Sequence, residues 1–217
     1  MKKDEREALL KLKLVEMKQY ELQLYAKGVR FVAGVDEVGR GPLAGPVVAA
    51  CVVLPEDFQV LGIDDSKKLS EKKRAQMYEC IIKECLAYGV GVVDNSIIDE
   101  INILEATKLA MKQAIDEANK NLEGEIDHVL IDALTLKDVN LAQTGIVKGD
   151  SKSVSIAAAS IVAKVIRDKM MAEFHEKYPC YAFDRNKGYG TELHYAGLRE
   201  QGCCEIHRKT FIKQFLT

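Results

Sequence analysis

The sequence lacks the residue patterns that mark zinc-binding, disulfide-rich and membrane proteins. Its six cysteines form no C-x-x-C pair, and none lies at zinc-ligand spacing from the four histidines. We interpret the cysteines as buried or free thiols in a reducing compartment. No stretch reaches the ~18 consecutive apolar residues of a membrane span, and residues 1–30 are charged and helical rather than similar to a signal peptide. We therefore expect a cytoplasmic protein without membrane contact.

Motifs of several enzyme classes are also missing. The sequence contains no G-x-x-x-x-G-K-[ST] element, which excludes a P-loop nucleotidase. It contains no G-x-S-x-G elbow, and Ser160 lies within a helical pattern, so a Ser/His/Asp nucleophile has no support. We interpret His194 and His207 as isolated surface or packing residues.

Charge of either sign is not in excess, because the formal net charge is −2. With 47% hydrophobic and 29% charged residues over 217 positions, the composition is that of a globular protein with a sizeable core. The segment 67–74 holds five basic residues and one acid, and such a local patch can bind nucleic acid. The sequence has no internal repeat or apolar heptad pattern, and we expect a monomer.

Hydrophobic periodicity predicts an α/β fold with a mixed sheet. Seven residues join the first two predicted strands, which is too short for a parallel crossover, so these strands should be antiparallel. After Pro179 no strand is evident, which suggests a domain over 1–178 and a helical segment over 179–217. The predicted strands are 31–38, 46–54, 87–93, 128–132 and 143–148, and the predicted helices are 4–26, 71–86, 102–121 and 155–178.

Four acids stand at or beside strand ends, where α/β proteins form their sites. Asp36 and Glu37 end the first strand, Asp132 ends HVLID, and Asp150 follows QTGIVK. Carboxylates that converge there would repel one another, and a divalent cation relieves that repulsion. Oxygen ligands without cysteine or histidine favour Mg²⁺ or Mn²⁺. Taken singly, each acid is more often a surface or capping residue, as Asp150 would be at a helix start.

The stretch GVDEVGRGPLAG poses a geometric problem. Adjacent side chains of a strand point to opposite faces, so Asp36 and Glu37 share one site only if the strand ends or bends there. Gly39 and Gly41 make such a bend possible. The run from Gly39 to Ala44 also matches a dinucleotide-binding G-x-G-x-x-G/A motif. That hypothesis is disfavoured because PVVAACVVL, which follows, has the pattern of a strand rather than a helix.

Two further elements carry the chemistry of phosphate and base binding. DSKKLS places Lys67 in a loop before a helix start, where phosphate can bind. KGYGT sets Tyr189 between two glycines, from which its ring could stack on a sugar or base with Lys187 near a phosphate. A solvated charge run and a loop tyrosine closing over the core are the alternative interpretations.

Taken together, the motifs resemble those of the type 2 ribonuclease H family, bacterial ribonuclease HII. The resemblance runs from about Met17 to His207 through VAGVDEVGRGPLAGPVVAACVVLP, DDSKKLS, VLIDAL, KGDSKSVSIAAASIVAKVIRD and YPCYAFDRNKGYGT. It implies a ribonuclease H-like mixed β-sheet flanked by helices, with a helical C-terminal segment.

The resemblance also implies roles for individual residues. The family's four catalytic, metal-binding acids correspond to Asp36, Glu37, Asp132 and Asp150. Asp168 in VIRD is a rival for the fourth position, but it lies well inside a helix whereas Asp150 adjoins a strand end.

The substrate-binding elements carry over in the same way. The turn Gly39-Arg40-Gly41 resembles the element that contacts the ribose 2′-hydroxyl. Tyr189 matches the tyrosine that stacks at the RNA–DNA junction, and Lys67 matches a lysine near the phosphate.

The activity implied is hydrolysis of RNA paired to DNA, including cleavage 5′ of a single ribonucleotide embedded in duplex DNA. Two Mg²⁺ or Mn²⁺ ions would take part, leaving a 3′-hydroxyl and a 5′-phosphate. A non-catalytic nucleic-acid binder of the same fold is the alternative, and negative charge facing phosphate disfavours it.

Overall fold

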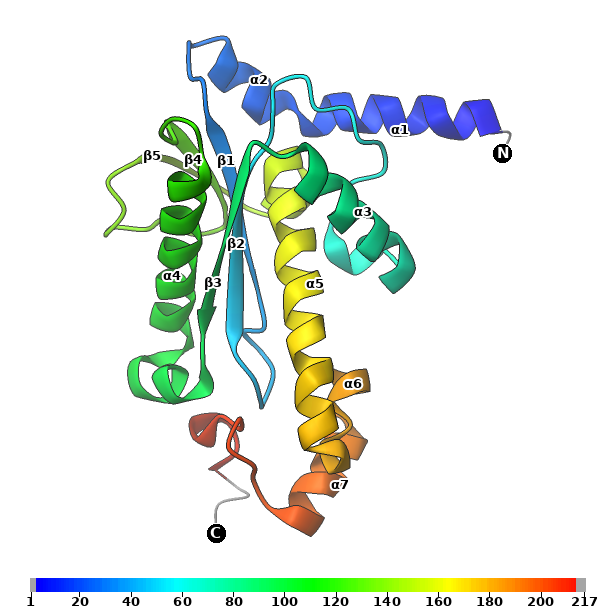
Figure 1. The fold of residues 1–217 in the computed structure, drawn as a ribbon, viewed down its shortest axis with the longest axis vertical. Helices are drawn as coiled ribbons and strands as arrows, with labels where there is room; N and C mark the ends of the chain where they lie inside the picture. The colour runs from blue at the N-terminus through cyan, green and yellow to red at the C-terminus, as the bar shows by residue number, and fades with distance from the viewer. Residues whose placement is uncertain (1–2, 214–217) are drawn as a thin grey trace.

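A mixed five-stranded sheet forms the centre of the protein within residues 3–213, which are the residues that this computed structural model describes (Figure 1). The strand order is β3-β2-β1-β4-β5. β1 pairs antiparallel with β2 and parallel with β4, which confirms the antiparallel pairing and the mixed sheet expected from the sequence. The strands are β1 Val32–Val38, β2 Val47–Val53, β3 Ala87–Val93, β4 His128–Asp132 and β5 Ala142–Ile146.

Helices cover both faces of this sheet, with α4 on one side and α5 on the other. Alternate residues of β2 enter the two cores, and all seven are fully buried, which explains the continuous apolar run in the sequence. The α-helices are α1 Lys3–Met17, α2 Gln19–Tyr25, α3 Glu71–Glu84, α4 Asn95–Asn121, α5 Val154–Lys177, α6 Phe183–Asn186 and α7 Glu192–Gln201. Short 3₁₀ turns are η1 Ser66–Lys68, η2 Gly149–Ser151, η3 Pro179–Tyr181 and η4 Lys209–Phe211.

α5 lies unusually close to β1. A Cβ atom added to Gly34 would stand 2.0 Å from the carbonyl carbon of Ser155, so only glycine permits this approach. The run SIAAAS at the start of α5 supplies the small side chains on the helix side. The close packing fixes the N-terminal end of α5 against the strand that carries Asp36.

The N-terminal helix expected over 4–26 is instead two helices, α1 and α2, separated at Lys18. Lys18 is buried, and its ammonium donates to the carbonyls of Glu56 (2.6 Å) and Phe58 (3.2 Å). α2 then places Glu21 under the start of α5, where it accepts hydrogen bonds from Ser153 Oγ (2.6 Å) and Ser155 N–H (3.0 Å). These tertiary contacts leave no signal in local periodicity.

α4 begins earlier than the expected start at Asn102. Asp94 caps it by accepting from the N–H groups of Ser96 and Ile97. The Asn102 cap does form, because its side chain accepts from the N–H of Leu104 and Glu105, but it stands at a kink inside the helix with φ 68°.

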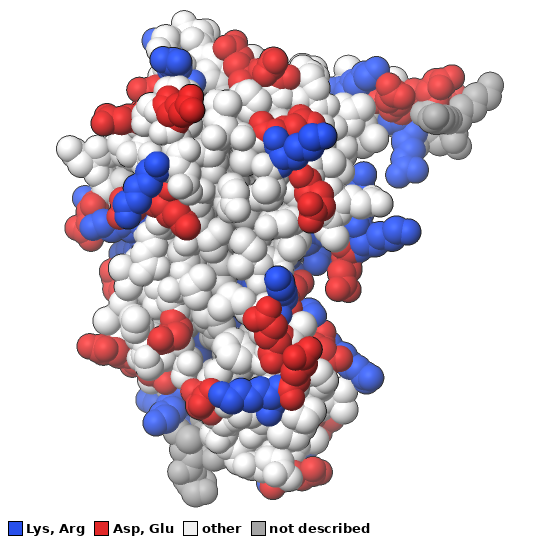
Figure 2. All heavy atoms as spheres, viewed as in Figure 1, with Lys and Arg blue, Asp and Glu red and all other residues white. Residues whose placement is uncertain are grey.

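The segment after α5 forms the short helices expected from the sequence and packs around the C-terminal end of α5 (Figure 1). An isolated β-bridge joins His207 to Ala44, in the loop between β1 and β2. The C-terminal segment is therefore attached to the edge of the sheet that bears the acids. On the face drawn in Figure 2, acidic and basic side chains are interspersed rather than gathered by sign. No helix among residues 3–213 has the length and apolarity needed to cross a membrane.

Candidate active site

Two of the four acids stand side by side at the ends of neighbouring strands. The parallel register pairs Val35 of β1 with Ile131 of β4, so Asp36 and Asp132 are the next residues along each strand. Parallel strands bring their carboxyl ends to the same edge of a sheet. The sheet topology therefore brings together residues almost a hundred positions apart.

Asp36 is a buried carboxylate that accepts hydrogen bonds from a backbone N–H group and a hydroxyl. Its Oδ1 accepts the backbone N–H of Glu37 at 2.8 Å, and the hydroxyl of Ser160 on α5 also hydrogen-bonds to it. Burial raises the pKa of Asp36 well above its ordinary value, and the neighbouring charges of Glu37 and Asp132 raise it further. Ser160, which the sequence excluded as a nucleophile, thus orients a carboxylate.

Glu37 lies on the opposite strand face by alternation, at the point where β1 ends. Its Oε1 pairs with the Arg40 guanidinium at 3.3 Å, while its Oε2 is buried without a partner among the described residues. Burial raises the pKa of Glu37 even though Arg40 opposes the shift. β1 continues through Val38, still paired with β2, and the chain bends at Gly39, whose φ is 91°.

Asp132 and Asp150 are joined through the turn that follows β5. Asp132 Oδ1 accepts the N–H of Gly149 at 2.7 Å, which holds η2 against the end of β4. Burial raises the pKa of Asp150, as do the carboxylates of Asp65 and Asp132. The Lys67 ammonium lies 3.9 Å from Asp150 Oδ2 and opposes that shift, so the lysine predicted near the site does face it.

The donor chemistry of these acids fits a hard divalent cation. The potential ligands are carboxylate oxygens, and the buried Glu37 Oε2 has no partner among residues 3–213. Burial, and after it repulsion from neighbouring carboxylates, raises the pKa of three of the four acids. Within the same residues, no three acidic, histidine or cysteine side chains already surround a common point as in a formed metal site.

The glycine turn lies next to Tyr189. A Cβ atom added to Gly41 would stand 3.6 Å from Cε1 of that ring, and the tyrosine side chain is 46% exposed. Arg40 and Gly41 are exposed as well, whereas Gly39 is buried. An open aromatic face and an open backbone turn thus adjoin each other close to the acids.

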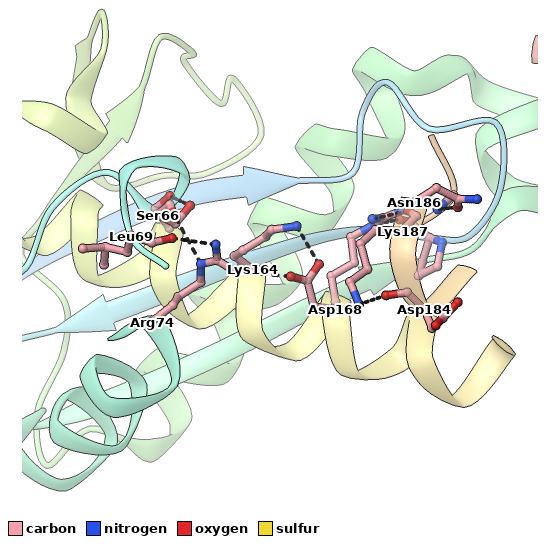
Figure 3. Close-up of polar contacts among 12 residues, drawn as sticks. Ser66, Leu69, Arg74, Lys164, Asp168, Asp184, Asn186 and Lys187 are labelled. Atoms are coloured by element: carbon pink, nitrogen blue, oxygen red, sulfur yellow. Dashed lines mark hydrogen bonds and ion pairs between the residues drawn. The ribbon is translucent and has the colours of Figure 1, made fainter. Parts of the chain in front are cut away.

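Lys187, which the sequence suggested could lie near a phosphate, is hydrogen-bonded within its own loop. Its ammonium donates to the carbonyl of Asp184 at 2.5 Å (Figure 3). In this structure the Lys187 side chain therefore stabilises its own loop.

Asp168, the alternative candidate for the fourth acid, forms ion pairs with two basic side chains. It pairs with Lys164 at 2.6 Å and with Arg74 at 3.4 Å (Figure 3). Arg74 also donates to the carbonyls of Ser66 and Leu69, at 3.0 Å each. These contacts give Asp168 a structural role behind the loop that carries Lys67.

Of the two interpretations given for His194 and His207, surface or packing residues, the structure confirms packing, but the two histidines are not isolated because they contact each other. Both are buried, and their Nε2 atoms lie 2.9 Å apart. His194 Nδ1 bonds the carbonyl of Tyr189 at 2.9 Å. The sequence also gave no sign that Arg167 and Arg208 would be fully buried beside the glycine turn. Long-range pairings of this kind leave no periodic or motif signal.

Comparison with known proteins agrees with this fold. The family model described as Ribonuclease HII matches residues 33–214. The chain is 57% identical to Ribonuclease HII of Listeria monocytogenes serotype 4a (strain HCC23), over 97% of this chain and 78% of the relative. It is 54% identical to Ribonuclease HII of Bacillus subtilis (strain 168), over 97% and 81%. The RNase HII in a solved PCNA:RNase HII complex from Archaeoglobus fulgidus matches with a TM-score of 0.69 at 27% identity, covering 82% of this chain and 93% of that one.

Proposed function

We propose, on the premise that this chain belongs to the ribonuclease HII family, that it cleaves 5′ of single ribonucleotides embedded in duplex DNA. Family membership makes the protein a nuclease that hydrolyses the RNA strand of RNA–DNA hybrids, on a ribonuclease H fold. The observation that carries the finer proposal is the position of Asp36 and Asp132 beside an exposed glycine turn and Tyr189.

In this proposal the four acids bind Mg²⁺ or Mn²⁺. Bound divalent ions would activate water and stabilise the leaving 3′-oxygen. The protein's part is to hold the carboxylates: Ser160 and the Glu37 N–H orient Asp36, and the Gly149 N–H orients Asp132. Glu37 supplies a buried oxygen that has no other partner among the described residues. The acids concerned are Asp36, Glu37, Asp132 and Asp150.

The substrate side of the proposal uses Gly39-Arg40-Gly41, Tyr189 and Lys67. The 2′-hydroxyl is the group that separates RNA from DNA at one position, and a glycine turn lets backbone groups approach it closely. Tyr189 has the exposed ring that stacking on a sugar or base requires. Lys67, 80% exposed, can contact a phosphate beside Asp150.

We also propose that residues 179–217 complete the substrate site of a catalytic region over 1–178. Tyr189 comes from this segment, and the bridge between Ala44 and His207 attaches it beside the glycine turn. Action as a cytoplasmic monomer stays a prediction from the sequence.

The test uses a DNA duplex with one ribonucleotide in a 5′-labelled strand. With Mg²⁺ or Mn²⁺ we expect a single cut 5′ of the ribonucleotide, with a 3′-hydroxyl that a polymerase can extend. An all-DNA duplex and a continuous RNA–DNA hybrid serve as controls. Cleavage of the hybrid alone would overturn the single-ribonucleotide proposal, and binding without cleavage of either substrate would favour a non-catalytic binder.

A further inference from the structure

Arg208 is a fully buried guanidinium without a carboxylate partner among the hydrogen bonds and ion pairs of residues 3–213. Its Nε donates to the carbonyl of Gly45 at 3.0 Å, its Nη1 to that of Arg40 at 2.9 Å, and its Nη2 to that of Gly39 at 2.5 Å. A buried arginine is ordinarily paired with an acid. Here the side chain instead binds three carbonyls of one loop.

Arg167 on α5 binds the same loop from another side. Its Nε donates to the carbonyl of Pro46 at 2.9 Å, its Nη2 to that of Ala44 at 3.3 Å, and its Nη1 to that of Lys187 at 2.9 Å. The side chain is fully buried as well. Two guanidinium groups therefore hold five carbonyls of the loop between β1 and β2, and one carbonyl of the loop before Tyr189.

The N–H groups of this loop are divided between the interior and the surface. Leu43 and Gly45 donate theirs to the carbonyls of Gly188 and Ile206, at 2.8 and 2.9 Å. Arg40 and Gly41 are exposed, and their N–H groups have no backbone acceptor within the described part of the chain. With its carbonyls bound by the two arginines, the turn has two N–H groups, on exposed residues, that are not used by the backbone of residues 3–213.

We propose that Arg208 is a positioning residue for ribose selectivity: by holding the carbonyls of Gly39 and Arg40, it aims the N–H groups of the turn at the 2′-hydroxyl. The inference rests on the role in ribose binding proposed above for this turn. Arg208 lies beneath the turn and touches no substrate itself. Arg167 holds the other end of the same loop.

Arginine suits this task because its five N–H donors form a rigid planar fork, whereas a lysine ammonium is a point charge on a flexible stem. The Phe211 ring, 5.2 Å from the Arg208 Cζ atom, limits movement of the guanidinium. Burial, with the charge of Arg167 as the second cause, lowers the pKa of Arg208 to about 9, so the side chain remains charged at neutral pH. Replacement by lysine would keep the charge and lose the fork.

The test compares Arg208→Lys with Arg199→Lys, a matched change on α7 at an exposed arginine paired with Glu192. Selectivity is the Ki of an unmodified DNA duplex as competitor divided by the KM of the single-ribonucleotide duplex. We expect Arg208→Lys to raise the KM about tenfold while Ki stays within twofold, because a small misplacement of donors weakens only the contact to ribose. Arg199→Lys should leave both constants unchanged.

A purely structural role for Arg208 predicts a different pattern, in which the active fraction and kcat fall while the ratio of Ki to KM is kept. That pattern would overturn the inference. If Arg208→Lys does not fold, Arg167→Lys tests the same holding of the loop, and an unchanged ratio in that variant would again overturn it. A wild-type enzyme whose ratio is near one would instead refute ribose binding by the turn, independently of Arg208.

Discussion

The Asp36 carboxylate is costly to bury in its charged form, and hydrogen bonds nevertheless fix its position. Burial and two neighbouring carboxylates disfavour its charged form, while the Glu37 N–H and the Ser160 hydroxyl favour it. Ser160 is in turn hydrogen-bonded to Ser66 at 2.9 Å. The residue is thus held in one orientation by donors from both β1 and α5, as a metal ligand needs to be.

Asp36→Asn should abolish most of the activity and leave the fold intact. Loss of a group that merely orients a metal ligand costs ~10–100-fold, so loss of a ligand should lower kcat by at least ~100-fold. The melting temperature should hold or rise, because the amide removes a buried charge. Steady-state cleavage of a hybrid and calorimetry measure the two effects, with exposed Asp116→Asn as control. Retained cleavage would remove Asp36 from the proposed metal ligands.

Asp150 and Asp168 can be separated by paired substitutions to asparagine. Asp150→Asn should lower kcat by at least ~100-fold with little change in stability, because its neighbours include the repelling carboxylates of Asp65 and Asp132. Asp168→Asn should keep most of the activity and lose roughly 1–3 kcal/mol in the free energy of unfolding, because Lys164 and Arg74 lose their shared acid. Urea denaturation and kcat report both values. The reverse pattern would make Asp168 the fourth acid.

At the scale of elements, glycines set how closely strands, helices and turns approach. Gly34 lets α5 pack onto β1, and α5 brings Ser160 to Asp36. Gly41, in the turn that follows the strand, has open space around it apart from the Tyr189 ring. The same residue type thus serves core packing at one position and access to a ligand at the other.

Substitution to alanine should therefore affect stability at the first of these glycines and substrate binding at the second. Gly34→Ala should lower the free energy of unfolding by more than ~3 kcal/mol, because its methyl group would overlap the backbone of Ser155. Gly41→Ala should leave stability within ~0.5 kcal/mol and raise the KM for the single-ribonucleotide duplex. Urea titration and initial rates measure these effects. A stable Gly34→Ala protein would show that α5 can move away from β1, contrary to this packing.

At the scale of the whole molecule, a buried pair of histidines joins two parts of the C-terminal segment, the loop of Tyr189 and the stretch around His207 that bridges to Ala44. When both rings are neutral, His194 Nδ1–H donates to the Tyr189 carbonyl, so its Nε2 accepts from His207 Nε2–H. His207 Nδ1 then accepts the N–H of Cys204 at 2.9 Å. His207 Nδ1 also lies 3.1 Å from Cys204 Sγ and 3.3 Å from the Cys204 carbonyl oxygen. The contact between the two Nε2 atoms holds one proton, and a second proton there would place two donors against each other.

Acidification should therefore weaken the fold through this pair. Burial lowers the pKa of His207 from 6.5 to about 4, with the His194 ring as the second cause. Between these two pKa values the unfolded chain binds a proton that the folded chain does not. The contribution of His207 to the free energy of unfolding is therefore fully present above pH 6.5 and is lost as the pH falls toward 4. The maximum loss is roughly 3 kcal/mol.

The measurement is the free energy of unfolding against pH for the wild type, His207→Gln and the control His175→Gln, which changes a half-buried histidine beside Asp184. Only His207→Gln should flatten the curve between pH 6.5 and 4. Burial also raises the pKa values of Asp36, Glu37 and Asp150, which gives a slope of opposite sign, so the difference between variants isolates the histidine. Equal slopes in all three proteins would refute the proposed neutral pair.

The sequence by itself determined the features that depend on a few neighbouring residues. Alternation and β-branched runs gave β3 and β4 their observed bounds, and α3 begins at Glu71 as predicted, with Ser70 as its cap. The short loop after β1 required the antiparallel pairing that is observed. Acids at strand ends indicated where a site would form, because side-chain chemistry and strand ends are both local properties.

Only the tertiary structure decided which distant groups meet. The contact of Lys18 with Glu56 and the hold of Arg208 on the glycine turn each join residues far apart in the chain, and the histidine pair joins two short elements of the C-terminal segment. Such contacts follow from how helices pack on the sheet, and they are fixed by burial and hydrogen-bond satisfaction rather than by periodicity. The sequence thus supplied the acids and the turn, and packing of the C-terminal segment supplied the groups that hold the turn in place.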